Sequence, residues 1–391
     1  MIRVAILGST GSIGRSTLEV IDRHPEHFRV VALAANRALK PLAEQVRRYR
    51  PMVAALADGT ELVKSQDLPA ARWLSGSEAL AEIVQSPDVD VVVNALVGSA
   101  GLEPTIQTLL AGKRLALANK ESLVAGGDLV VAAEAVGGGE LVPVDSEHSA
   151  ILQCLEGHDP GSVLRLILTA SGGPFRGRAS RELRDVGPSQ ALNHPTWSMG
   201  AKISVDSATL ANKALELIEA HFLYGIDYDS LGVVIHPQSI VHSFVEFVDG
   251  SVLAQLGFPT MELPILYALS YPQRLADATL QTFDPVKASP LVFEEVDRET
   301  FTLFGLGEQA GRLGGTSPAV YNAANETAVD AFLRERISFP EMSDVVAGSL
   351  DRMGSRPVES LEQILEVDRE ARAVAGEIVR LLERKDSIGT S

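Results

Sequence analysis

The sequence predicts an α/β protein that starts with a doubly wound parallel sheet, continues as an α+β region and ends in helices. Short apolar runs alternate with helix-like stretches over residues 1–145, which is the order of a parallel sheet covered by helices. A long polar stretch and a hairpin signal break this alternation over residues 146–271. A strand-poor connecting segment follows at 272–297, and the pattern of residues 298–391 is helical. We therefore expect domain boundaries at these positions.

The first third of the chain carries the apolar runs of the predicted parallel sheet. The runs are continuously apolar rather than alternating, as expected for strands that are buried on both faces. Helix-like stretches at Ser16–Arg23 and Pro41–Arg50 separate the first of them. The predicted strands are Arg3–Leu7, Phe28–Ala34, Val53–Leu56, Val89–Leu96, Arg114–Ala118 and Glu140–Val144.

The middle region begins with a predicted strand at Val163–Ala170 and continues as a polar stretch that contains proline and glycine. Loops of that length in compact domains are usually functional or disordered, so residues 171–201 are predicted to form a mobile lid. A helix is expected at Ser207–Tyr224, with Asp206 or Ser207 as its N-cap.

Three further strands are predicted at Val233–His236, Val241–Phe247 and Ser251–Leu256. The last two are joined by Asp249-Gly250, a strong signal for a two-residue hairpin turn, so this region has an antiparallel component. The C-terminal region is predicted to contain the helices Ala319–Arg336, Met342–Arg352 and Ser360–Arg384, followed by a frayed tail at Lys385–Ser391.

Composition excludes several classes of function. The 391 residues carry a formal net charge of −17, which argues against a broad nucleic-acid or anionic-membrane surface. The lone cysteine, Cys154, cannot form an intrachain disulfide and fits a reducing compartment. The N-terminus lacks the pattern of a signal peptide, and no apolar run approaches the roughly 18 residues of a membrane span. We expect a cytoplasmic protein.

A glycine turn, Gly8-Ser-Thr-Gly11-Ser-Ile-Gly14, lies between the first strand and the first helix. Glycine lets the backbone approach a pyrophosphate, and the helix N-terminus stabilises its negative charge. The spacing differs from the usual dinucleotide fingerprint, so a tightly packed strand–helix turn is the alternative. The position at the first strand–helix junction favours a cofactor site.

The end of the second predicted strand indicates which dinucleotide is bound. NAD enzymes usually place Asp or Glu there, whereas this chain has Asn36 and Arg37. A guanidinium suits a 2′-phosphate through charge-assisted hydrogen bonds, so NADP(H) is favoured. A solvated loop charge remains the alternative for Arg37.

Two groups of polar residues suggest a divalent cation beside a phosphate. Asp145 and Glu147 are two apart after a strand, so in extended chain both carboxylates would face one side and could bind Mg²⁺ or Mn²⁺. Asn212, Lys213 and Glu216 share one helix face, which suits a phosphorylated polyol beside the ion. Solvated polar surfaces are the alternative for both groups.

The lid sequence ends in His194-Pro-Thr-Trp197-Ser-Met-Gly200. Proline and glycine are suited to hinge positions, and Trp197 could close over a ligand and exclude water. His194 could donate to a phosphate or hydroxyl group; a structural histidine and a core tryptophan are the alternatives.

Together these segments resemble the 1-deoxy-D-xylulose 5-phosphate reductoisomerase family over nearly the whole chain. The C-terminal stretch Asn322-Ala-Ala-Asn-Glu326 belongs to the match. The other matching motifs are Leu7-Gly-Ser-Thr-Gly-Ser-Ile-Gly14, Ala118-Asn-Lys-Glu-Ser-Leu123, Pro143-Val-Asp-Ser-Glu-His148, Ala170-Ser-Gly-Gly-Pro-Phe-Arg176, His194-Pro-Thr-Trp-Ser-Met-Gly200, Lys202-Ile-Ser-Val-Asp-Ser-Ala-Thr209, Asn212-Lys213, Glu216 and His236-Pro-Gln-Ser239.

The resemblance implies a set of ligand-binding residues. Mg²⁺ or Mn²⁺ would bind Asp145, Glu147 and Glu216. NADPH would contact Thr10, Gly11, Ser12, Ile13, Asn36, Arg37, Asn119, Glu121 and Gly200. The substrate would be surrounded by Lys120, Ser146, Glu147, Ser171, His194, Trp197, Ser207, Asn212, Lys213 and Glu216, with its phosphate held mainly by Ser171, Ser207, Asn212 and Lys213. The residues expected to be catalytic are Lys120, Glu147, His194, Lys213 and Glu216.

The implied activity is the NADPH- and metal-dependent rearrangement and reduction of 1-deoxy-D-xylulose 5-phosphate to 2-C-methyl-D-erythritol 4-phosphate, in the non-mevalonate route to isoprenoid precursors. The implied protein is a homodimer with a Rossmann-type NADPH-binding domain at 1–145 and a catalytic and dimerisation domain at 146–271. One departure is visible, because many members have Gly-x-Asn where this chain has Asn36-Arg37-Ala38.

Two other functions remain as alternatives at this point. A simple NADP-dependent dehydrogenase would need no metal. A non-catalytic dinucleotide sensor would use its C-terminal helices to bind a partner, but it would not explain the carboxylates, amides and lysines that lie far from the glycine turn.

Overall fold

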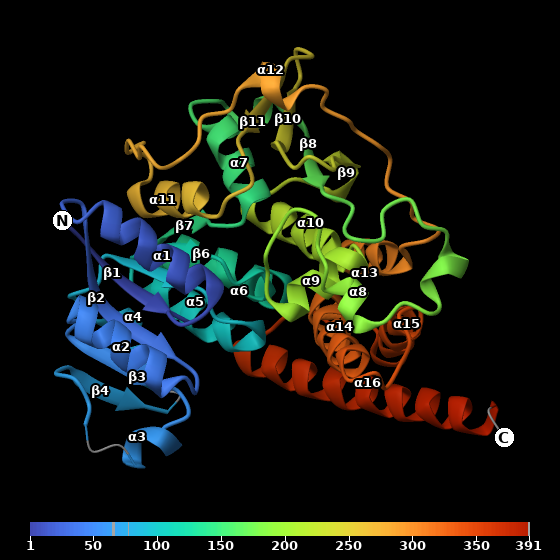
Figure 1. Ribbon diagram of the computed structural model, residues 1–391, viewed down its shortest axis with the longest axis horizontal. Coiled ribbons are helices and arrows are strands. Elements are labelled where there is room, and N and C mark those ends of the chain that lie inside the picture. The colour runs from blue at the N-terminus through green and yellow to red at the C-terminus, as the bar shows by residue number, and fades with distance from the viewer. Residues whose placement is uncertain (65–66, 77, 390–391) are drawn as a thin grey trace. The chain divides into compact units, whose positions relative to one another are not determined.

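The structure is a computed structural model that describes residues 1–64, 67–76 and 78–389 (Figure 1). The described residues divide into two compact units. The first consists of Met1–Ser122, Leu129–Ser149 and Thr260–Gln281. The second consists of Leu123–Asp128, Ala150–Pro259 and Thr282–Ser391. The chain therefore passes more than once between the units, and the segment at 260–281 returns to the first unit rather than staying with its neighbours in sequence.

The described part of the first unit contains a seven-stranded sheet in the order β4-β3-β2-β1-β5-β6-β7, in which all neighbouring strands are parallel. This confirms the predicted doubly wound parallel sheet. The order reverses at β1, which pairs with β2 on one side and β5 on the other, and such switch points form ligand crevices. The strands are β1 (Ile2–Leu7), β2 (Phe28–Ala35), β3 (Val53–Leu56), β4 (Arg72–Ser75), β5 (Val91–Asn94), β6 (Arg114–Leu117) and β7 (Glu140–Pro143).

The strand β4 is absent from the sequence-based prediction. Its residues, Arg-Trp-Leu-Ser, are half-buried or exposed, because β4 lies at the edge of the sheet and lacks the continuous apolar run of the central strands. The helices that begin in this unit are α1 (Ser12–Arg23), α2 (Leu39–Tyr49), α3 (Thr60–Lys64), α4 (Glu78–Gln85), α5 (Leu102–Leu110), α6 (Lys120–Gly137), α7 (Ser146–Leu155) and α11 (Glu262–Ser270).

The described part of the second unit contains a four-stranded sheet in the order β11-β10-β8-β9. β8 (Val163–Ala170) runs parallel to β9 (Leu231–Ile235) and antiparallel to β10 (Val241–Phe247). β10 and β11 (Val252–Leu256) form the antiparallel hairpin that Asp249-Gly250 predicted. The mixed sheet confirms the α+β character of the middle region.

The helix predicted at Ser207–Tyr224 is in fact two helices. α9 (Ala201–Ala208) ends where Leu210 adopts a left-handed conformation with φ of 60°, and α10 (Ala211–Tyr224) begins after it. Ser207 and Asp206 lie near the C-terminal end of α9, so the prediction that one of them caps the helix was wrong. Leu210 occupies the N-cap position of α10 and supplies no side-chain cap.

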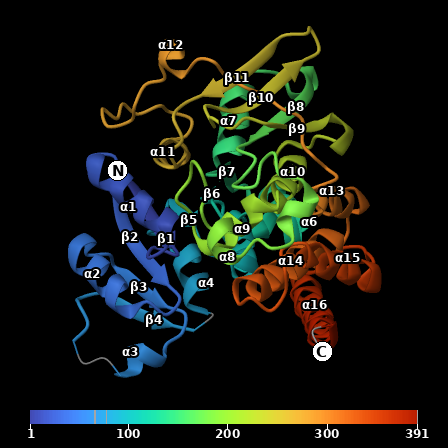
Figure 2. The ribbon, with the colours of Figure 1, turned by 45° about the vertical axis from the view of Figure 1, so that its right-hand side comes forward.

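The last part of the second unit is a helical bundle, coloured orange to red in Figure 2, as predicted. α14 (Ser317–Leu333) packs against α13 (Thr302–Leu313), α15 (Glu341–Met353) and α16 (Leu361–Gly389). The prediction of a frayed tail from Lys385 was wrong as far as Gly389, because α16 continues to that residue. Thr390 and Ser391 lie outside the described residues. Over the described ranges, no helix is both long enough and apolar enough to cross a membrane.

Candidate functional site

The glycine turn after β1 packs so closely that a side chain would not fit at Gly8 or Gly14. Gly8 has φ of +85°, and a Cβ there would lie 2.4 Å from the carbonyl oxygen of Ala95, which follows β5. A Cβ at Gly14 would lie 2.4 Å from the carbonyl oxygen of Gly8. The glycines therefore bring the N-terminus of α1 close to the ends of β1 and β5, at the switch point of the sheet.

The first turn of α1 is suited to an anion. Its N-cap, Gly11, provides no side-chain hydrogen bond to the helix, and the turn contains no acidic residue. Gly11 and Ser12 are exposed, while Thr10 and Ile13 are half-buried. The backbone N–H groups of this turn thus face a site where a negative charge would be stabilised by the helix dipole.

The guanidinium expected at the end of β2 is present and has a partner. Asn36 and Arg37 are both exposed, and Arg37 Nε lies 3.0 Å from Asp58 Oδ2, in the loop after β3. Hydrogen bonds from Thr60 and the nearby Arg37 hold the pKa of Asp58 below its usual value. Sequence reasoning missed Asp58, and no motif in the sequence marks it.

Two buried asparagines shape the loops beside the glycine turn. Asn94, at the end of β5, donates to the carbonyl oxygen of Gly101 at 2.9 Å and to Thr105 Oγ1 at 2.8 Å. Asn119 caps α6 by accepting from the N–H of Ser122, and donates to Leu96 O at 2.9 Å. Asn94 was not singled out from the sequence, although a polar residue ending the apolar run Val-Val-Val is a signal that could have found it.

Asn119 also connects to Glu121. The Nδ2 group of Asn119 lies 3.0 Å from Glu121 Oε2, and both residues are buried. The amide of Asn119 is thus bonded to several groups of its own loop. These hydrogen bonds fix the shape of the loop that precedes α6.

The carboxylates of the first unit lie after β7. Lys120 Nζ donates to Asp145 Oδ2 at 2.7 Å, and both side chains are largely buried. Asp145 and Glu147 each offer a carboxylate oxygen, and these oxygens lie within 4.8 Å of each other. Ser146 Oγ donates to Glu147.

The prediction that Asp145 and Glu147 face one side because the chain is extended there was wrong. Ser146 and Glu147 form the first turn of α7 rather than extended chain, and the N–H of Ser149 bonds to Asp145 O at 2.8 Å. The two carboxylates meet because Asp145 precedes the helix and Glu147 belongs to its first turn. Acidic groups at a helix N-terminus are stabilised by the helix dipole.

In the second unit, the first turns of α10 carry a buried carboxylate between two donors. Glu216 accepts from Asn212 Nδ2 at 2.5 Å and from Lys213 Nζ at 2.5 Å. Glu216 and Lys213 are almost completely buried. The predicted sharing of one helix face by Asn212, Lys213 and Glu216 is therefore present.

Ser171 and His194 are also together in this unit. Ser171 follows β8 directly, and its Oγ lies 3.0 Å from His194 Nε2. His194 Nδ1 accepts the backbone N–H groups of Thr196 at 3.1 Å and Trp197 at 2.9 Å. The proton of a neutral His194 is therefore on Nε2, and burial lowers the pKa of this imidazole.

The loop after β8 reaches the end of α9. A Cβ at Gly173, which has φ of +67°, would lie 2.5 Å from the carbonyl oxygen of Ser207. This glycine therefore lets the backbone of the loop approach the backbone of α9 at Ser207. Trp197 is half-buried, and Gly200 is exposed at the N-cap of α9.

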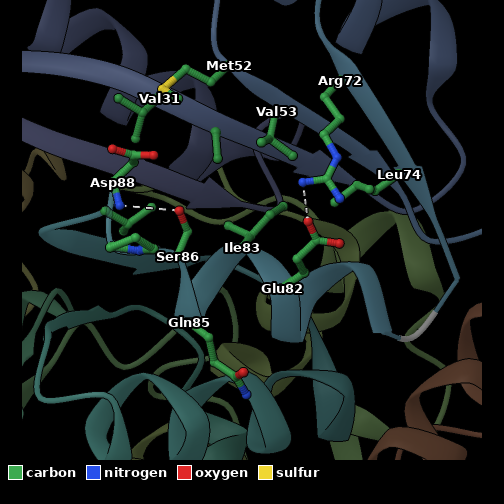
Figure 3. A pocket seen from close by; sticks show the side chains of 13 residues that line it. Val31, Met52, Val53, Arg72, Leu74, Glu82, Ile83, Gln85, Ser86 and Asp88 are labelled. Atoms are coloured by element: carbon green, nitrogen blue, oxygen red, sulfur yellow. Dashed lines mark hydrogen bonds and ion pairs between the residues drawn. The ribbon is translucent and has the colours of Figure 1, made fainter.

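A pocket of about 450 Å³ lies elsewhere in the first unit (Figure 3). Its walls include Val53 and Arg72, the first residues of β3 and β4, and Ile83 of α4. It therefore lies at the N-terminal ends of these strands, whereas the glycine turn and Arg37 lie at the carboxyl ends. Arg72 pairs with Glu82 inside it, so these charges satisfy each other.

Comparison with known proteins gives one family. Residues 4–127 match the family model described as 1-deoxy-D-xylulose 5-phosphate reductoisomerase. Residues 141–224 match the model of the 1-deoxy-D-xylulose 5-phosphate reductoisomerase C-terminal domain, and residues 256–374 match a DXP reductoisomerase C-terminal domain.

Relatives that carry the same name cover almost the whole chain. The chain is 53% identical over 390 residues to 1-deoxy-D-xylulose 5-phosphate reductoisomerase of Nocardia farcinica, covering 97% of this chain and 95% of the relative. It is 50% identical over 383 residues to that of Symbiobacterium thermophilum, covering 96% and 98%.

Solved structures give the same result. The reductoisomerase of Zymomonas mobilis in complex with NADPH has a TM-score of 0.90 and 41% identity, covering 97% of this chain and 99% of the other. DOX-P reductoisomerase in complex with NADPH, fosmidomycin and magnesium has a TM-score of 0.91 and 40% identity, covering 98% and 99%.

Proposed function

The chain belongs to the 1-deoxy-D-xylulose 5-phosphate reductoisomerase family, and from this premise we infer how its residues perform the reaction. The protein is an NADP-dependent oxidoreductase that converts 1-deoxy-D-xylulose 5-phosphate to 2-C-methyl-D-erythritol 4-phosphate with NADPH and a divalent cation. The observation that carries the assignment is a set of carboxylates. Asp145 and Glu147 each offer a carboxylate oxygen after β7, and these oxygens lie within 4.8 Å of each other. Glu216 of α10 is proposed as the third ligand.

The proposed metal ligands fit Mg²⁺ or Mn²⁺ in their chemistry. All three offer carboxylate oxygens, which these hard cations prefer, and no sulfur or imidazole ligand belongs to the group as described. A bound divalent cation supplies Lewis-acid polarisation of a carbonyl and stabilises alkoxide charge. Lys120, bonded to Asp145, holds that carboxylate in place and brings a positive charge to the site.

The substrate phosphate is proposed to bind in the second unit. Ser171 and Ser207 offer hydroxyl groups, and His194 offers its Nε2–H, since its Nδ1 is engaged with the backbone. Lys213 adds the positive charge and Asn212 adds an amide. This places the phosphate among neutral donors and one ammonium group, in a chain whose net charge is −17.

NADPH is proposed to bind at the switch point of the sheet. Its pyrophosphate would lie over Thr10, Gly11, Ser12 and Ile13, where the absence of side chains at Gly8 and Gly14 permits a tight turn. NADPH supplies the hydride that reduces the rearranged carbonyl group. Asn36 and Arg37 would contact the adenosine end, where the 2′-phosphate can replace Asp58 as the partner of Arg37.

The lid at 171–201 is proposed to close over the substrate. Trp197 would cover the ligand, and Gly200, as N-cap of α9, would follow the movement and contact NADPH. Closure would exclude water while the reactive aldehyde intermediate awaits the hydride. Lys120, Ser146, Glu147 and Glu121 would complete the surroundings from the first unit.

Three further properties are part of this proposal. The enzyme acts in the cytoplasm, which is consistent with a chain that has a single cysteine, the buried Cys154. It is a homodimer, as sedimentation at micromolar concentration would establish. Residues 1–145 are proposed to serve NADPH binding and residues 146–271 catalysis, with 298–391 as the helical domain. Of the connection proposed at 272–297, the part up to residue 281 packs with the first unit, as do residues 260–271.

The activity is tested by following NADPH absorbance on addition of 1-deoxy-D-xylulose 5-phosphate. We expect oxidation that stops when a chelator is added and returns with excess Mg²⁺ or Mn²⁺. Oxidation that is indifferent to chelator would instead point to a dehydrogenase without a metal. Binding of NADPH without any oxidation would point to a sensor.

A further inference from the structure

The helix α9 carries a buried carboxylate that has no part in the proposed site. Asp206 is completely buried, and its Oδ1 accepts from Asn325 Nδ2 at 2.8 Å. Its Oδ2 lies 3.0 Å from Lys202 Nζ, one turn earlier in the same helix. Asp206 is thus a charged link between the helix that follows the lid and α14 of the C-terminal bundle.

Asn325 belongs to the Asn322-Ala-Ala-Asn-Glu326 motif, for which the proposed function has no use. Asn322 Nδ2 donates to Glu326 Oε1 at 3.2 Å, and Glu326 pairs with Arg372 of α16 at 2.7 Å. Asn322 and Asn325 are completely buried. The ion pair between Glu326 and Arg372 thus joins α14 to α16, in addition to the packing of α14 against the other helices of the bundle. Asn325, which donates to Asp206, lies on this well-anchored helix.

The link lies next to an unusual joint in the backbone. Leu210, between α9 and α10, is buried and has φ of 60°, a conformation that side chains with a Cβ disfavour. Thr209 Oγ1 donates to Val205 O at 3.2 Å and accepts the N–H of Ala211 at 3.3 Å. A strained joint of this kind persists only where its surroundings hold both helices in place.

The joint connects the residues that are proposed to hold the phosphate. Ser207 follows Asp206 directly, while Asn212, Lys213 and Glu216 lie on the first turns of α10. The angle between α9 and α10 therefore sets the position of the Ser207 hydroxyl relative to the Lys213 ammonium group. Burying a carboxylate is costly compared with an apolar side chain of similar size, so burial does not by itself give Asp206 a stabilising role.

We propose that Asp206, held by Asn325, is a positioning residue that fixes the α9–α10 joint in the geometry that binds a phosphate monoester. This inference rests on the proposed function, because it assumes that Ser207, Asn212 and Lys213 hold the substrate phosphate. It assigns to the C-terminal bundle a role in substrate recognition.

The test compares Asp206→Ala, Asn325→Ala and the double variant in steady-state kinetics. Loss of a hydrogen bond to a buried charge corresponds to roughly tenfold or more in binding, so the KM for 1-deoxy-D-xylulose 5-phosphate should rise about tenfold in each single variant. The double variant should be no worse than either single one, because both changes remove one interaction. kcat and the KM for NADPH should change by less than about threefold.

A matched control is Ser349→Ala, which removes a buried hydroxyl that bonds to Val345 O within α15 of the same bundle. It should leave the KM for the substrate unchanged even if the melting temperature falls. Asp206→Asn keeps an acceptor for Asn325 and should restore most of the substrate affinity. It also serves as the readout if Asp206→Ala does not fold.

Inorganic phosphate provides a probe that does not depend on turnover. Its inhibition constant should rise in the Asp206→Ala and Asn325→Ala variants by the same factor as the substrate KM. The inference is overturned if folded variants keep the wild-type KM and phosphate inhibition, if kcat alone falls, or if the two changes are additive. Failure of the wild-type protein to oxidise NADPH would contradict the proposed function instead.

Discussion

Single residues in the proposed site have their protonation set by their neighbours. His194 uses Nδ1 as an acceptor for two backbone N–H groups, so a second proton on that nitrogen would break both bonds. Burial lowers its pKa in addition. Both effects favour the neutral imidazole with its proton on Nε2, facing Ser171, which is the form that can donate to a phosphate oxygen.

Glu216→Gln should abolish most of the activity. The change keeps the shape of the side chain and its bond with Asn212, but it removes a charge from the proposed metal site. We expect kcat to fall at least about a hundredfold and the Mg²⁺ concentration for half-activity to rise. The exposed Glu299→Gln is the control, and comparable turnover in the two variants would refute a metal role for Glu216.

Arg37→Ala should affect one nucleotide more than the other. The guanidinium of Arg37 is exposed, and an exposed ion pair such as that with Asp58 contributes little free energy. Arg37 can therefore exchange this partner for a 2′-phosphate. The KM for NADPH should rise about tenfold, whereas the KM for NADH should barely change. Parallel changes in the two values would remove Arg37 from cofactor selection.

At the scale of elements, most strands and helices could be predicted, because continuous apolar runs and helical periodicity are local signals. The joint at Leu210 could not, since nothing about leucine indicates a left-handed conformation, which here depends on packing around α9 and α10. The helical start of α7 at Ser146 was missed for a similar reason. In both places the polar side chains lie close together as expected, whereas the predicted backbone geometry was wrong.

The segment after α11 is held to α1 by a buried ionic cluster. Asp277 accepts from Arg23 Nε at 2.8 Å, lies 3.2 Å from His24 Nε2, and accepts from the N–H of Thr279 at 2.9 Å. Burial alone would raise the pKa of Asp277, but these hydrogen bonds hold it far below its usual value. The cluster fastens residues of the returning segment 260–281 to the first helix of the same unit.

Asp277→Asn should therefore destabilise the first unit at neutral pH. Loss of the charge-assisted bonds is expected to cost about 2 kcal/mol, or roughly 4–8 °C in melting temperature. Because the folded pKa is depressed, the wild-type advantage is complete above the unfolded value of about 4 and declines as pH falls below it. Melting curves at pH 7 and pH 3 check this, and a difference that grows on acidification would contradict it.

At the scale of the whole molecule, the residues of the proposed site belong to two compact units. The glycine turn, Arg37 and the Asp145–Glu147 pair belong to one, while Ser171, His194 and the first turns of α10 belong to the other. The sequence could indicate the residues of both groups because each follows a strand or opens a helix. It could not indicate that residues 260–281 return to the first unit, since that contact depends on tertiary packing alone.

The division predicts that damage to the C-terminal bundle leaves nucleotide binding intact. Val367 is buried on α16, which packs against α14, so Val367→Asp places a charge in an apolar contact and should cost at least about 3 kcal/mol. Turnover should be lost, while NADPH should still bind as judged by its fluorescence. Glu366→Gln, on the exposed side of α16, should keep both properties. Loss of NADPH binding in the Val367 variant would show that the units do not fold separately.

The return of residues 260–281 to the first unit also constrains synthesis of the protein on the ribosome. α11 packs on α1, and Arg23 of α1 pairs with Glu262 of α11 and with Asp277. A nascent polypeptide therefore cannot complete its N-terminal unit until more than a hundred later residues have left the exit tunnel. Until then the side of α1 that packs against α11 stays exposed, and ribosome-associated chaperones can bind it.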